Sequence, residues 1–416
     1  MSLSTVTLSA AVRQNLLSLQ GTADLLATTQ SRLATGKKVN SALDNPTNFF
    51  TAAGLDSRAS DISNLLDSIG NGVQVLQAAN TGITSLSKLV DTAKSIANQV
   101  LQQPSGYSAK ATFTGNAPAT GAAGTATDLV NIGSGTANAL KGQTVVFKTA
   151  GGASNTLTIT DVIGANSANS ITAVNSWLSS KGIQLTASLN TNGSLTFTSS
   201  NDAASQTITN TGTYAAPGAG SSSSVDISGG AAFTTGTVVA AVADPVSQAT
   251  RSSLVTQYNQ IIQQITTTAQ DSSFNGINLL NGDSLKLVFD ETGKSTSTIT
   301  GVTFNPAGLG LGSLTAGTDF IDNTATNTVL TALNTASTTL RSQASAFGAN
   351  LSIVQIRQDF NKSLINVLQT GSSALTLADS NEEAANSQAL STRQSIATSA
   401  LSLANQSQQS VLQLLR

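Results

Sequence analysis

Apolar repeats at both ends of the chain place the strongest constraint on its fold. Near the N-terminus the repeat consists of Val12, Leu16, Leu19, Ala23, Leu26 and Leu33, with polar Gln30 at one position of the series. Spacings of three and four residues are typical of a helix that packs lengthwise against another helix. The chain also closes on the apolar run "SVLQLLR", although chain ends are usually polar unless they dock against a partner. We therefore predict that the two ends are helices that pair with each other and with further copies of the chain.

A second heptad series predicts a longer helix over residues 62–101. Its members are Ile62, Leu66, Ile69, Val73, Leu76, Ile83, Val90, Ala97 and Leu101. About 40 residues would form a helix about 60 Å long, which favours a coiled coil or bundle over a compact enzyme. Helical stripes return at about 250–269 and 326–368, and Gly371 is expected to interrupt the second of these. A final helix is predicted from about Ala384 to Arg416.

These stripes supply two sets of candidate packing positions. The helical core is expected to contain Ile62, Leu66, Ile69, Val73, Leu76, Ile261, Ile265, Leu340, Phe347, Leu351 and Val354. The inner assembly interface is expected to contain Val12, Leu16, Leu19, Leu26, Leu33, Leu401, Ala404, Val411, Leu412 and Leu415. An apolar stripe is usually ordinary core. A unit of two terminal helices, however, leaves one side of each helix wet unless other copies cover it, which favours ordering of the ends upon polymerisation.

The middle of the chain, residues 104–246, changes to Gly, Ser, Thr and Ala with short strand patterns such as "QTVVFKT" and "SLTFTSS". One short helix, "SITAVNSWLSSKG", interrupts them and carries Trp177 as an expected packing anchor. Asn192-Gly193 predicts a hairpin turn, and "LKLVFDETGKSTSTIT" predicts a second hairpin that turns at Glu291 to Gly293. The predicted fold class is therefore mainly α with a β-rich insert: long terminal helices in a coiled-coil bundle, plus an α+β outer domain.

Composition argues against an enzyme. The chain has no cysteine and no histidine, so neither a Ser-His-Asp nor a Cys-His nucleophile can be built, and zinc sites of the usual ligands are excluded. "DETGKST" resembles a phosphate-binding loop but has Val288 where the motif needs glycine, so a turn is the better interpretation. Adjacent Glu382 and Glu383 suit the start of the final helix. We expect no catalytic residue, cofactor or metal.

Charge and hydropathy restrict the partners. Charged residues make up only 10% of the chain and the net charge is −2, so no basic face for nucleic acid is expected. No run of 18 apolar residues predicts a membrane span. The N-terminal "MSLSTVTLSAAVRQNLLSLQ" lacks the pattern of a cleaved secretory signal, so export by another route is expected if the protein leaves the cell.

Four stretches together resemble bacterial flagellin, the subunit of the flagellar filament. They are "QSRLATGKKVNSALDNP", "GNGVQVLQAANTGI", "SSFNGINLLNG" and "LANQSQQSVLQLLR", in that order along the chain. With the helical sequence between them, they cover about the first 100 and last 170 residues. The resemblance implies an inner coil (D0-like) at 1–36 and 371–416, a helical core (D1-like) at 37–103 and 247–370, and a variable outer domain (D2-like) at 104–246.

The resemblance also implies a function and partners. The chain is expected to be exported unfolded by the flagellar type III apparatus and to polymerise with itself at the distal tip of an extracellular filament. A chaperone is expected at Ala384–Arg416, and hook-associated and cap proteins at the filament ends. A hook–filament junction protein, or a surface adhesin that binds through its insert, are the alternatives.

Two departures from the family pattern carry further expectations. Gln408 stands where the family often has proline, so the last helix is expected to continue unbroken. In enteric-type flagellins the second helix carries an Arg-rich epitope for Toll-like receptor 5. The matching stretch here is "LVDTAKSIANQ", which contains Ile96 and has Thr92 and Ser95 at positions that are usually arginine and glutamate. Recognition by this receptor is expected to be weak or absent.

Overall fold

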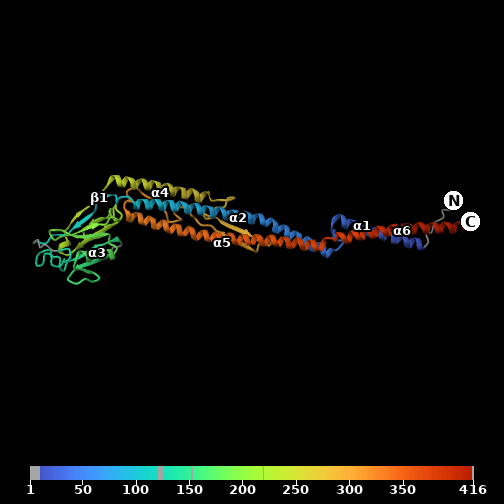
Figure 1. Cartoon of the computed structure of the whole chain (residues 1–416), viewed down its shortest axis with the longest axis horizontal. Helices are drawn as coiled ribbons and strands as arrows, with labels where there is room; N and C mark the ends of the chain where they lie inside the picture. Colours follow the sequence, from blue (N-terminus) through green and yellow to red (C-terminus); the bar gives the residue numbers. More distant parts are fainter. Residues whose placement is uncertain (1–9, 120–124, 151–152, 219, 415–416) are drawn as a thin grey trace. The chain divides into compact units, whose positions relative to one another are not determined.

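The computed structural model describes residues 10–119, 125–150, 153–218 and 220–414 (Figure 1). Contacts divide the chain into two compact units. The first comprises 1–73, 286–298 and 352–416, and the second comprises 74–285 and 299–351. The predicted class, mainly α with long terminal helices and a β-rich insert, is confirmed. The long helices are α1 (Ala10–Thr35), α2 (Pro46–Leu101), α4 (Pro245–Asp271), α5 (Asn323–Thr376) and α6 (Ser380–Leu414).

Local sequence sets the ends of these helices. Gly36 follows α1 with a φ of 68°, the left-handed conformation that glycine adopts readily after a helix. Pro46 opens α2, and the side chain of Asn45 accepts a hydrogen bond from Asn48 N. Asp244 caps α4 in the same way by accepting from Ser247 N. The carboxylate of Asp379 accepts from Asn381 N and Glu382 N at the start of α6.

Three sequence-based boundaries are wrong. The second long helix begins at Pro46 rather than residue 62, because the cap at Asn45 starts the helix before its heptad series becomes regular. Gly371 does not interrupt α5, which continues to Thr376; a helical glycine costs only about 1 kcal/mol, too little to break a helix held by packing. The final helix begins at Ser380, not Ala384. Its continuation through position 408 is confirmed, since α6 runs to Leu414.

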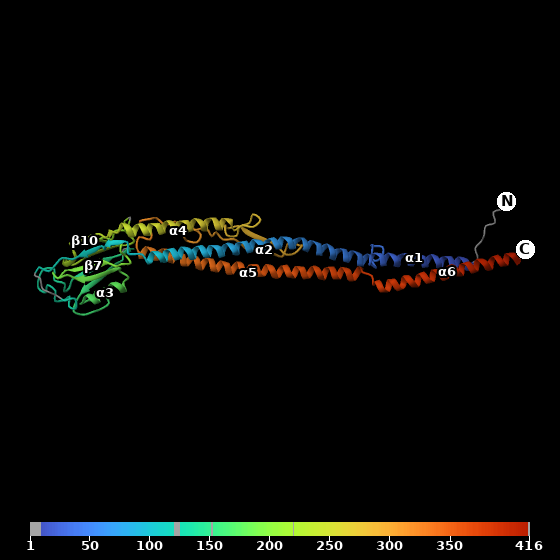
Figure 2. The same ribbon diagram turned by 45° about the horizontal axis from the view of Figure 1, so that its top comes forward.

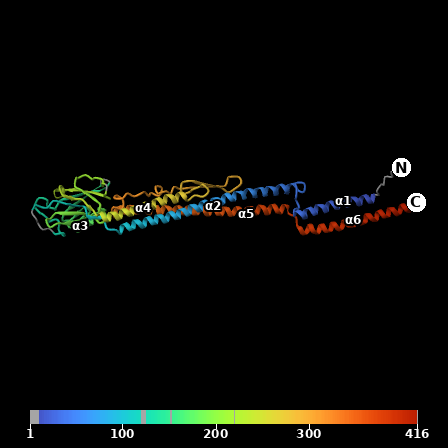
Figure 3. The same cartoon turned by 90° about the horizontal axis from the view of Figure 1, so that it is seen from above.

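In the second unit, residues 74–101 of α2 lie beside α4 and residues 323–351 of α5 (Figures 1 and 3). The facing sides of the helices are apolar and fully buried, and include Leu76, Ile83, Leu86, Val90, Tyr258, Ile265, Leu333, Ala336 and Leu340. The segment between the hairpin and α5 also contributes, because the ring of Phe320 meets the ring of Tyr258 edge-on at 5.8 Å. This segment consists of loop and turns.

The described part of the insert contains two main sheets, one α-helix and a short 3-10 helix at Ala231–Phe233 (Figure 2). Its strands are β1 (Tyr107–Ala109), β2 (Thr112–Thr114), β3 (Thr144–Lys148), β4 (Ser154–Ile159), β5 (Ser167–Ala168), β6 (Leu185–Leu189), β7 (Leu195–Ser199), β8 (Thr207–Thr209), β9 (Ser224–Gly229), β10 (Thr237–Val239) and β11 (Val242–Ala243). One sheet has the order β10-β2-β7-β6 and the other β5-β4-β3-β9-β8, while β1 pairs with β11.

Aromatic residues fill the core of the insert. Phe147 contacts Phe197 edge-on at 5.2 Å, and Trp177 of α3 (Ile171–Ser180) packs on Phe147 at 5.7 Å. Trp177 is buried and its indole N–H donates to Ala165 O, so its expected role as a packing anchor is confirmed. The hairpin at Asn192-Gly193 is confirmed as well, with β6 and β7 paired antiparallel and Gly193 at a φ of 83°.

The second predicted hairpin is also present, as β12 (Ser284–Val288) and β13 (Thr296–Thr300). Its turn closes where the carboxylate of Asp290 accepts a hydrogen bond from Ser295 N, and Gly293 takes a φ of 72°. "DETGKST" is therefore a turn, as the missing glycine indicated.

Buried polar contacts join the insert to the helices within the second unit. Asp322, at the start of α5, accepts hydrogen bonds from the hydroxyls of Ser205 and Ser222 in the insert. Arg251 of α4 donates to the carbonyl oxygens of Pro104 and Phe320, at 2.8 Å and 2.9 Å. Burial lowers the pKa of Arg251, and the charge of Asp322 opposes that shift. Neither residue could be predicted from the sequence, because no local pattern marks a charged side chain for burial.

Candidate assembly interface

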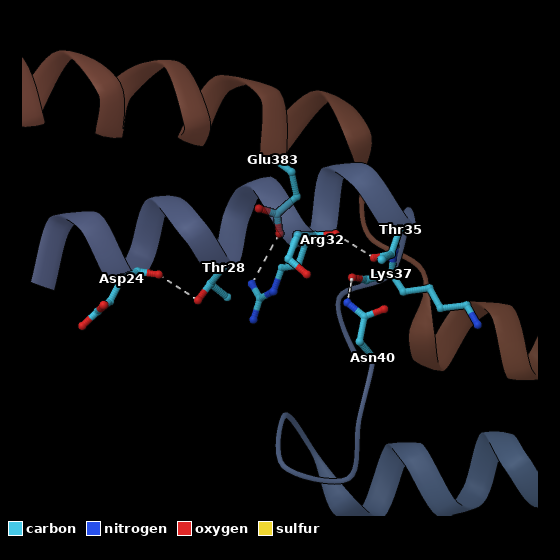
Figure 4. A network of polar contacts seen from close by, with 8 residues as sticks. Asp24, Thr28, Arg32, Thr35, Lys37, Asn40 and Glu383 are labelled. Carbon is cyan, nitrogen blue, oxygen red and sulfur yellow. Dashed lines mark hydrogen bonds and ion pairs between the residues drawn. The ribbon is translucent and has the colours of Figure 1, made fainter.

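The terminal helices α1 and α6 pack against each other in an antiparallel pair. Main-chain hydrogen bonds tie the segments between the helices, from Lys38 N to Thr376 O and from Ala378 N to Gly36 O. At the same end, Arg32 of α1 forms an ion pair with Glu383 of α6, with Nη1 and Oε1 3.4 Å apart (Figure 4). Glu383 is nearly buried, whereas its neighbour Glu382 is exposed. Glu382 thus lies exposed in the first turn of α6, and Glu383 packs against α1.

The face of α6 turned toward α1 is a regular but weakly apolar heptad. Its least exposed positions follow intervals of four and three residues: Glu383, Ser387, Leu390, Gln394, Ala397, Leu401 and Ala404. Leu401 and Ala404, both predicted for the inner interface, belong to this face. Three of the seven side chains are polar and two are alanine, so the pair buries little apolar surface per turn.

Only part of the predicted α1 stripe lies against α6. Val12 is buried and Leu19 and Leu26 are half-buried, while Leu16 and Leu33 remain exposed. The same contact face also includes Asn15, Thr22, Thr29 and Arg32, which are less exposed than Leu16 and Leu33. Further apolar side chains on the two helices are exposed as well: Leu17, Leu25, Ile396 and Leu403. The predicted interface therefore has an inner half within the chain and an outer half that no described residue covers.

Three predicted interface residues cannot be placed. The side chains of Val411 and Leu412, and all of Leu415, lie outside the described residues.

The loop between α1 and α2 presents an apolar side chain on a well-ordered turn. The carboxylate of Asp44 accepts from Asn40 N and Ser41 N at 2.9 Å and 2.8 Å, and these backbone bonds hold the pKa of Asp44 below its usual range. Leu43 stands at the tip with 96% of its surface exposed. Phe50, in the first turns of α2, is exposed too. Leu43 and Phe50 are single exposed apolar side chains, which are common on protein surfaces.

In the first unit, α2 and α5 pack through a small core in which Ala59, Ile62 and Leu368 are buried. The tip of the β12–β13 hairpin binds to this helix pair. The amide of Asn361 donates to Phe289 O at 2.9 Å, the guanidinium of Arg357 lies 5.9 Å from the Phe289 ring, and Arg58 pairs with Glu291 at 2.5 Å. These three polar or cationic contacts hold the hairpin against α2 and α5, whose buried apolar core is small there.

The opposite face of α5 carries a second apolar stripe without a partner among the described residues. Ile353, Ile356, Phe360 and Val367 recur at three, four and seven residues, and all four are exposed. Heptad spacing on a wet helix face is typical of a surface that packs on another helix. This stripe was not predicted from the sequence, because the heptad positions chosen there belong to the buried seam of the same helix.

Most of the predicted core positions are buried, each within its own unit. Ile62, Ile69, Val73, Leu76, Ile265, Leu340, Phe347 and Val354 are buried, while Leu66, Ile261 and Leu351 are half-buried. In the stretch compared with the receptor epitope, Thr92 and Ser95 are exposed on α2, whereas Ile96 is almost buried.

Comparison with known proteins bears directly on the two helical ends. The model of the bacterial flagellin N-terminal helical region matches residues 4–112, and that of the bacterial flagellin C-terminal helical region matches residues 330–415. The chain belongs to the bacterial flagellin family. This is a family of structural proteins, not of enzymes, and its members form the flagellar filament.

Individual relatives agree with that membership. The chain is 31% identical over 172 residues to flagellin FljM of Caulobacter vibrioides, which covers 41% of this chain and 62% of the relative. It is 30% identical over 172 residues to flagellin FljO of the same organism, with the same two coverages. A flagellin of Brucella melitensis is 28% identical over 171 residues, 39% of this chain and 61% of the relative. The matched part thus spans less than two thirds of each of these relatives.

The described helices also bear on membrane insertion. None of them, over the residues that the structure places, is long and apolar enough to cross a bilayer.

Proposed function

We propose that this flagellin polymerises with itself into the helical filament of a bacterial flagellum. The observation that carries the proposal is the outer half of the terminal helix pair, where Leu16, Leu33 and Leu403 are exposed. Full burial of an exposed leucine is worth about 1.5–3 kcal/mol, and contact with another copy would recover the part of it that corresponds to the exposed surface, roughly 0.5–2 kcal/mol for each of these side chains. The exposed stripe on α5 offers a second surface of the same kind.

The two surfaces differ from each other, which suits an open polymer. A contact between unlike surfaces of identical copies does not close into a dimer and propagates as a helix. The small charge of the chain, −2 over 416 residues, adds little repulsion between copies in a dense array.

The route to the filament follows from the same proposal. The chain is exported unfolded through a type III apparatus and added at the distal tip, outside the cell. An export chaperone binds the apolar positions of α6 before export, and hook-associated and cap proteins contact the filament ends. The absence of cysteine supports unfolded passage, because no disulfide can staple the chain. We propose no binding to nucleic acid and no membrane insertion.

The test is seeded polymerisation of a double variant, Leu16→Glu with Leu33→Glu. Both side chains are exposed in the single chain, so helicity by circular dichroism is expected to stay unchanged while elongation from seeds stops. The matched control, Thr172→Glu with Ser179→Glu, adds the same charge to exposed positions of α3 and is expected to elongate normally. Normal filaments from the Leu16/Leu33 variant, seen by negative-stain electron microscopy, would refute the proposed interface.

Recognition by Toll-like receptor 5 is proposed to be weak or absent. Thr92 and Ser95 are exposed and uncharged, so this face of α2 offers neither the guanidinium nor the carboxylate of enteric-type flagellins. Reporter cells that carry the receptor are expected to respond only at high dose. A full response at low dose would contradict this proposal.

A further inference from the structure

The sheet β10-β2-β7-β6 has two edge strands, and among the described residues only one of them has hydrogen-bond partners for its outward-facing N–H and C=O groups. Register aligns Val238 of β10, Phe113 of β2, Phe197 of β7 and Ala187 of β6 in one row across the sheet. The ends of this row, Ala187 and Val238, mark the two edges. An edge strand exposes unpaired N–H and C=O groups that can template pairing with another strand.

The β6 edge is closed by side-chain and main-chain partners. The side chain of Asn175, on α3, accepts from Ala187 N at 2.7 Å and donates to Ala187 O at 3.1 Å. It thereby supplies both hydrogen bonds that another strand would make at that residue. Leu185 N is satisfied by Ile183 O at 2.8 Å.

The β10 edge is open. Hydrogen bonds from Gly115 N to Leu195 O and from Ser199 N to Ala111 O flank the Phe113–Phe197 pair. Alternation along antiparallel strands therefore turns the N–H and C=O of Phe113 toward β7, and those of Thr112 and Thr114 toward β10. By the same alternation the N–H and C=O of Val238 point away from the sheet, and no described residue forms a hydrogen bond with them.

The surface around this edge is apolar and uncharged. The side chains of Val238 and Val239 are 39% and 50% exposed, and Val242 and Val246, which follow in the chain, are exposed further. No charged residue occurs between Asp226 and Asp244. Proteins usually protect an open edge with charge, proline or a bulge. Within β10 only the shortness of the strand, three residues, limits pairing, while the opposite edge has a dedicated cap.

We propose that β10 is a docking strand for the β10 strand of a second copy of this chain. Three features select that occupant. The open backbone groups require a strand; the uncharged valines require an apolar, uncharged one; and the closed β6 edge excludes a head-to-tail join of β10 to β6. The simplest join that uses this edge on both copies is an antiparallel pair about a two-fold axis at Val238, in which the two Val238 residues exchange both N–H···O bonds.

This pairing lies in the insert and goes beyond the polymer contacts of the terminal helices. Three residues per strand form a small interface, well below the area of stable complexes. The pairing is therefore weak in dilute protein and gains occupancy where copies are held close together, because tethering raises the effective concentration. It joins outer domains of neighbouring copies side by side.

Disulfide trapping in the full-length chain tests the proposal, because the natural sequence has no cysteine. In a hydrogen-bonded antiparallel pair the two Cα atoms are about 5.5 Å apart, within the range of a disulfide. Under mild oxidation without seeds, Val238→Cys is expected to form a covalent dimer several-fold faster than the control Val162→Cys. Val162 is 72% exposed but lies outside the edge.

Mixed cysteine variants test the register. Pairing centred on Val238 sets Thr237 opposite Val239 of the other copy, so a mixture of Thr237→Cys and Val239→Cys is expected to cross-link faster than either variant alone. Equal rates for Val238→Cys and Val162→Cys would overturn the proposal, as would preferential cross-linking of Val238→Cys to a different protein in culture supernatant. Seeded pelleting of each variant is measured separately, so failure of the pairing and failure of polymerisation are told apart.

Discussion

At the scale of single residues, buried polar groups carry the joint between the insert and the helices. Arg251 is almost completely buried, yet among the described residues no carboxylate lies within ion-pairing distance of it. Its guanidinium instead binds main-chain oxygens of Pro104 and Phe320 and the amide oxygen of Asn323. These groups come from the segment after α2 and from the start of α5. One side chain therefore holds three segments in register.

Replacement of this arginine is expected to be costly. Arg251→Met keeps the length of the side chain but leaves buried carbonyl oxygens without donors, which lowers the free energy of unfolding by about 3 kcal/mol. Urea unfolding followed by circular dichroism measures the loss. Arg341→Met, at an exposed position of α5, is the control and is expected to change stability by less than about 0.5 kcal/mol.

Because of Tyr258, the second unit is expected to lose stability at alkaline pH. Burial raises the pKa of Tyr258 from 10.0 to about 12, with a smaller contribution from Asp319. The phenol is the protonated form, so the stability is complete below pH 10 and is lost as pH rises from 10 to 12. Two pKa units correspond to about 3 kcal/mol. Tyr258→Phe is expected to remove this loss, as seen by urea unfolding at pH 9 and pH 11.5. An unchanged loss in the variant would contradict the assignment.

At the scale of elements, the glycines inside the long helices differ in the space around them. Substitution by alanine therefore shows whether helix propensity or close packing decides stability at each position. A side-chain carbon at Gly82 of α2 would lie 2.2 Å from Ser272 Oγ and 2.6 Å from a methyl of Leu280. At Gly371 of α5 it would meet only a Leu55 methyl at 3.5 Å, an ordinary contact, and at Gly348 it would meet nothing within 4 Å.

The three glycines are expected to respond differently to alanine. Gly371→Ala and Gly348→Ala gain helix propensity and stabilise by about 0.5–1 kcal/mol each. Gly82→Ala forces the α2–α4 packing apart and destabilises by about 1–3 kcal/mol. Thermal unfolding of the three variants measures the difference. Stabilisation by Gly82→Ala would show that the helices can separate there at no cost.

The same elements show how far the sequence determines the fold. Heptad spacing predicted five long helical stretches and the pairing of the two ends, because packing and pattern share one period. It did not predict the whole face of α1 that would contact α6. That face contains Asn15, Thr22 and Arg32 beside Val12, Leu19 and Leu26, and Arg32 pairs there with Glu383, a residue about 350 positions away. The buried Arg251 and the open β10 edge were invisible for the same reason, since both depend on segments that meet only in the folded chain.

At the scale of the whole molecule, the surfaces proposed for assembly are apolar rather than charged. Leu16, Leu33, Ile356 and Phe360 are exposed, whereas the whole chain has only 19 basic and 21 acidic residues. Salt therefore has few charges to screen at these surfaces, while the free energy gained by burying apolar surface decreases on cooling.

Polymer assembly is accordingly expected to respond to temperature more than to salt. The elongation rate from seeds should change by less than about twofold between 0.05 and 0.5 M NaCl, where the Debye length falls from about 14 Å to about 4 Å. It should fall clearly between 30 °C and 5 °C. Light scattering measures both series. A rate that rises tenfold with salt would indicate that charge repulsion, not apolar contact, controls addition.

The α1–α6 pair has a mechanical consequence. Its seam contains Ser387, Gln394 and Ala397, so a force applied to the C-terminal end would peel α6 away turn by turn against little resistance. The insert has a shared core that contains Phe113, Phe147 and Phe197, so it is expected to unfold cooperatively in one step. In a single-molecule pulling record the two would differ: a gradual lengthening at low tension, then an abrupt rupture. The insert, not the pair of terminal helices, would set the force needed to extend the whole chain.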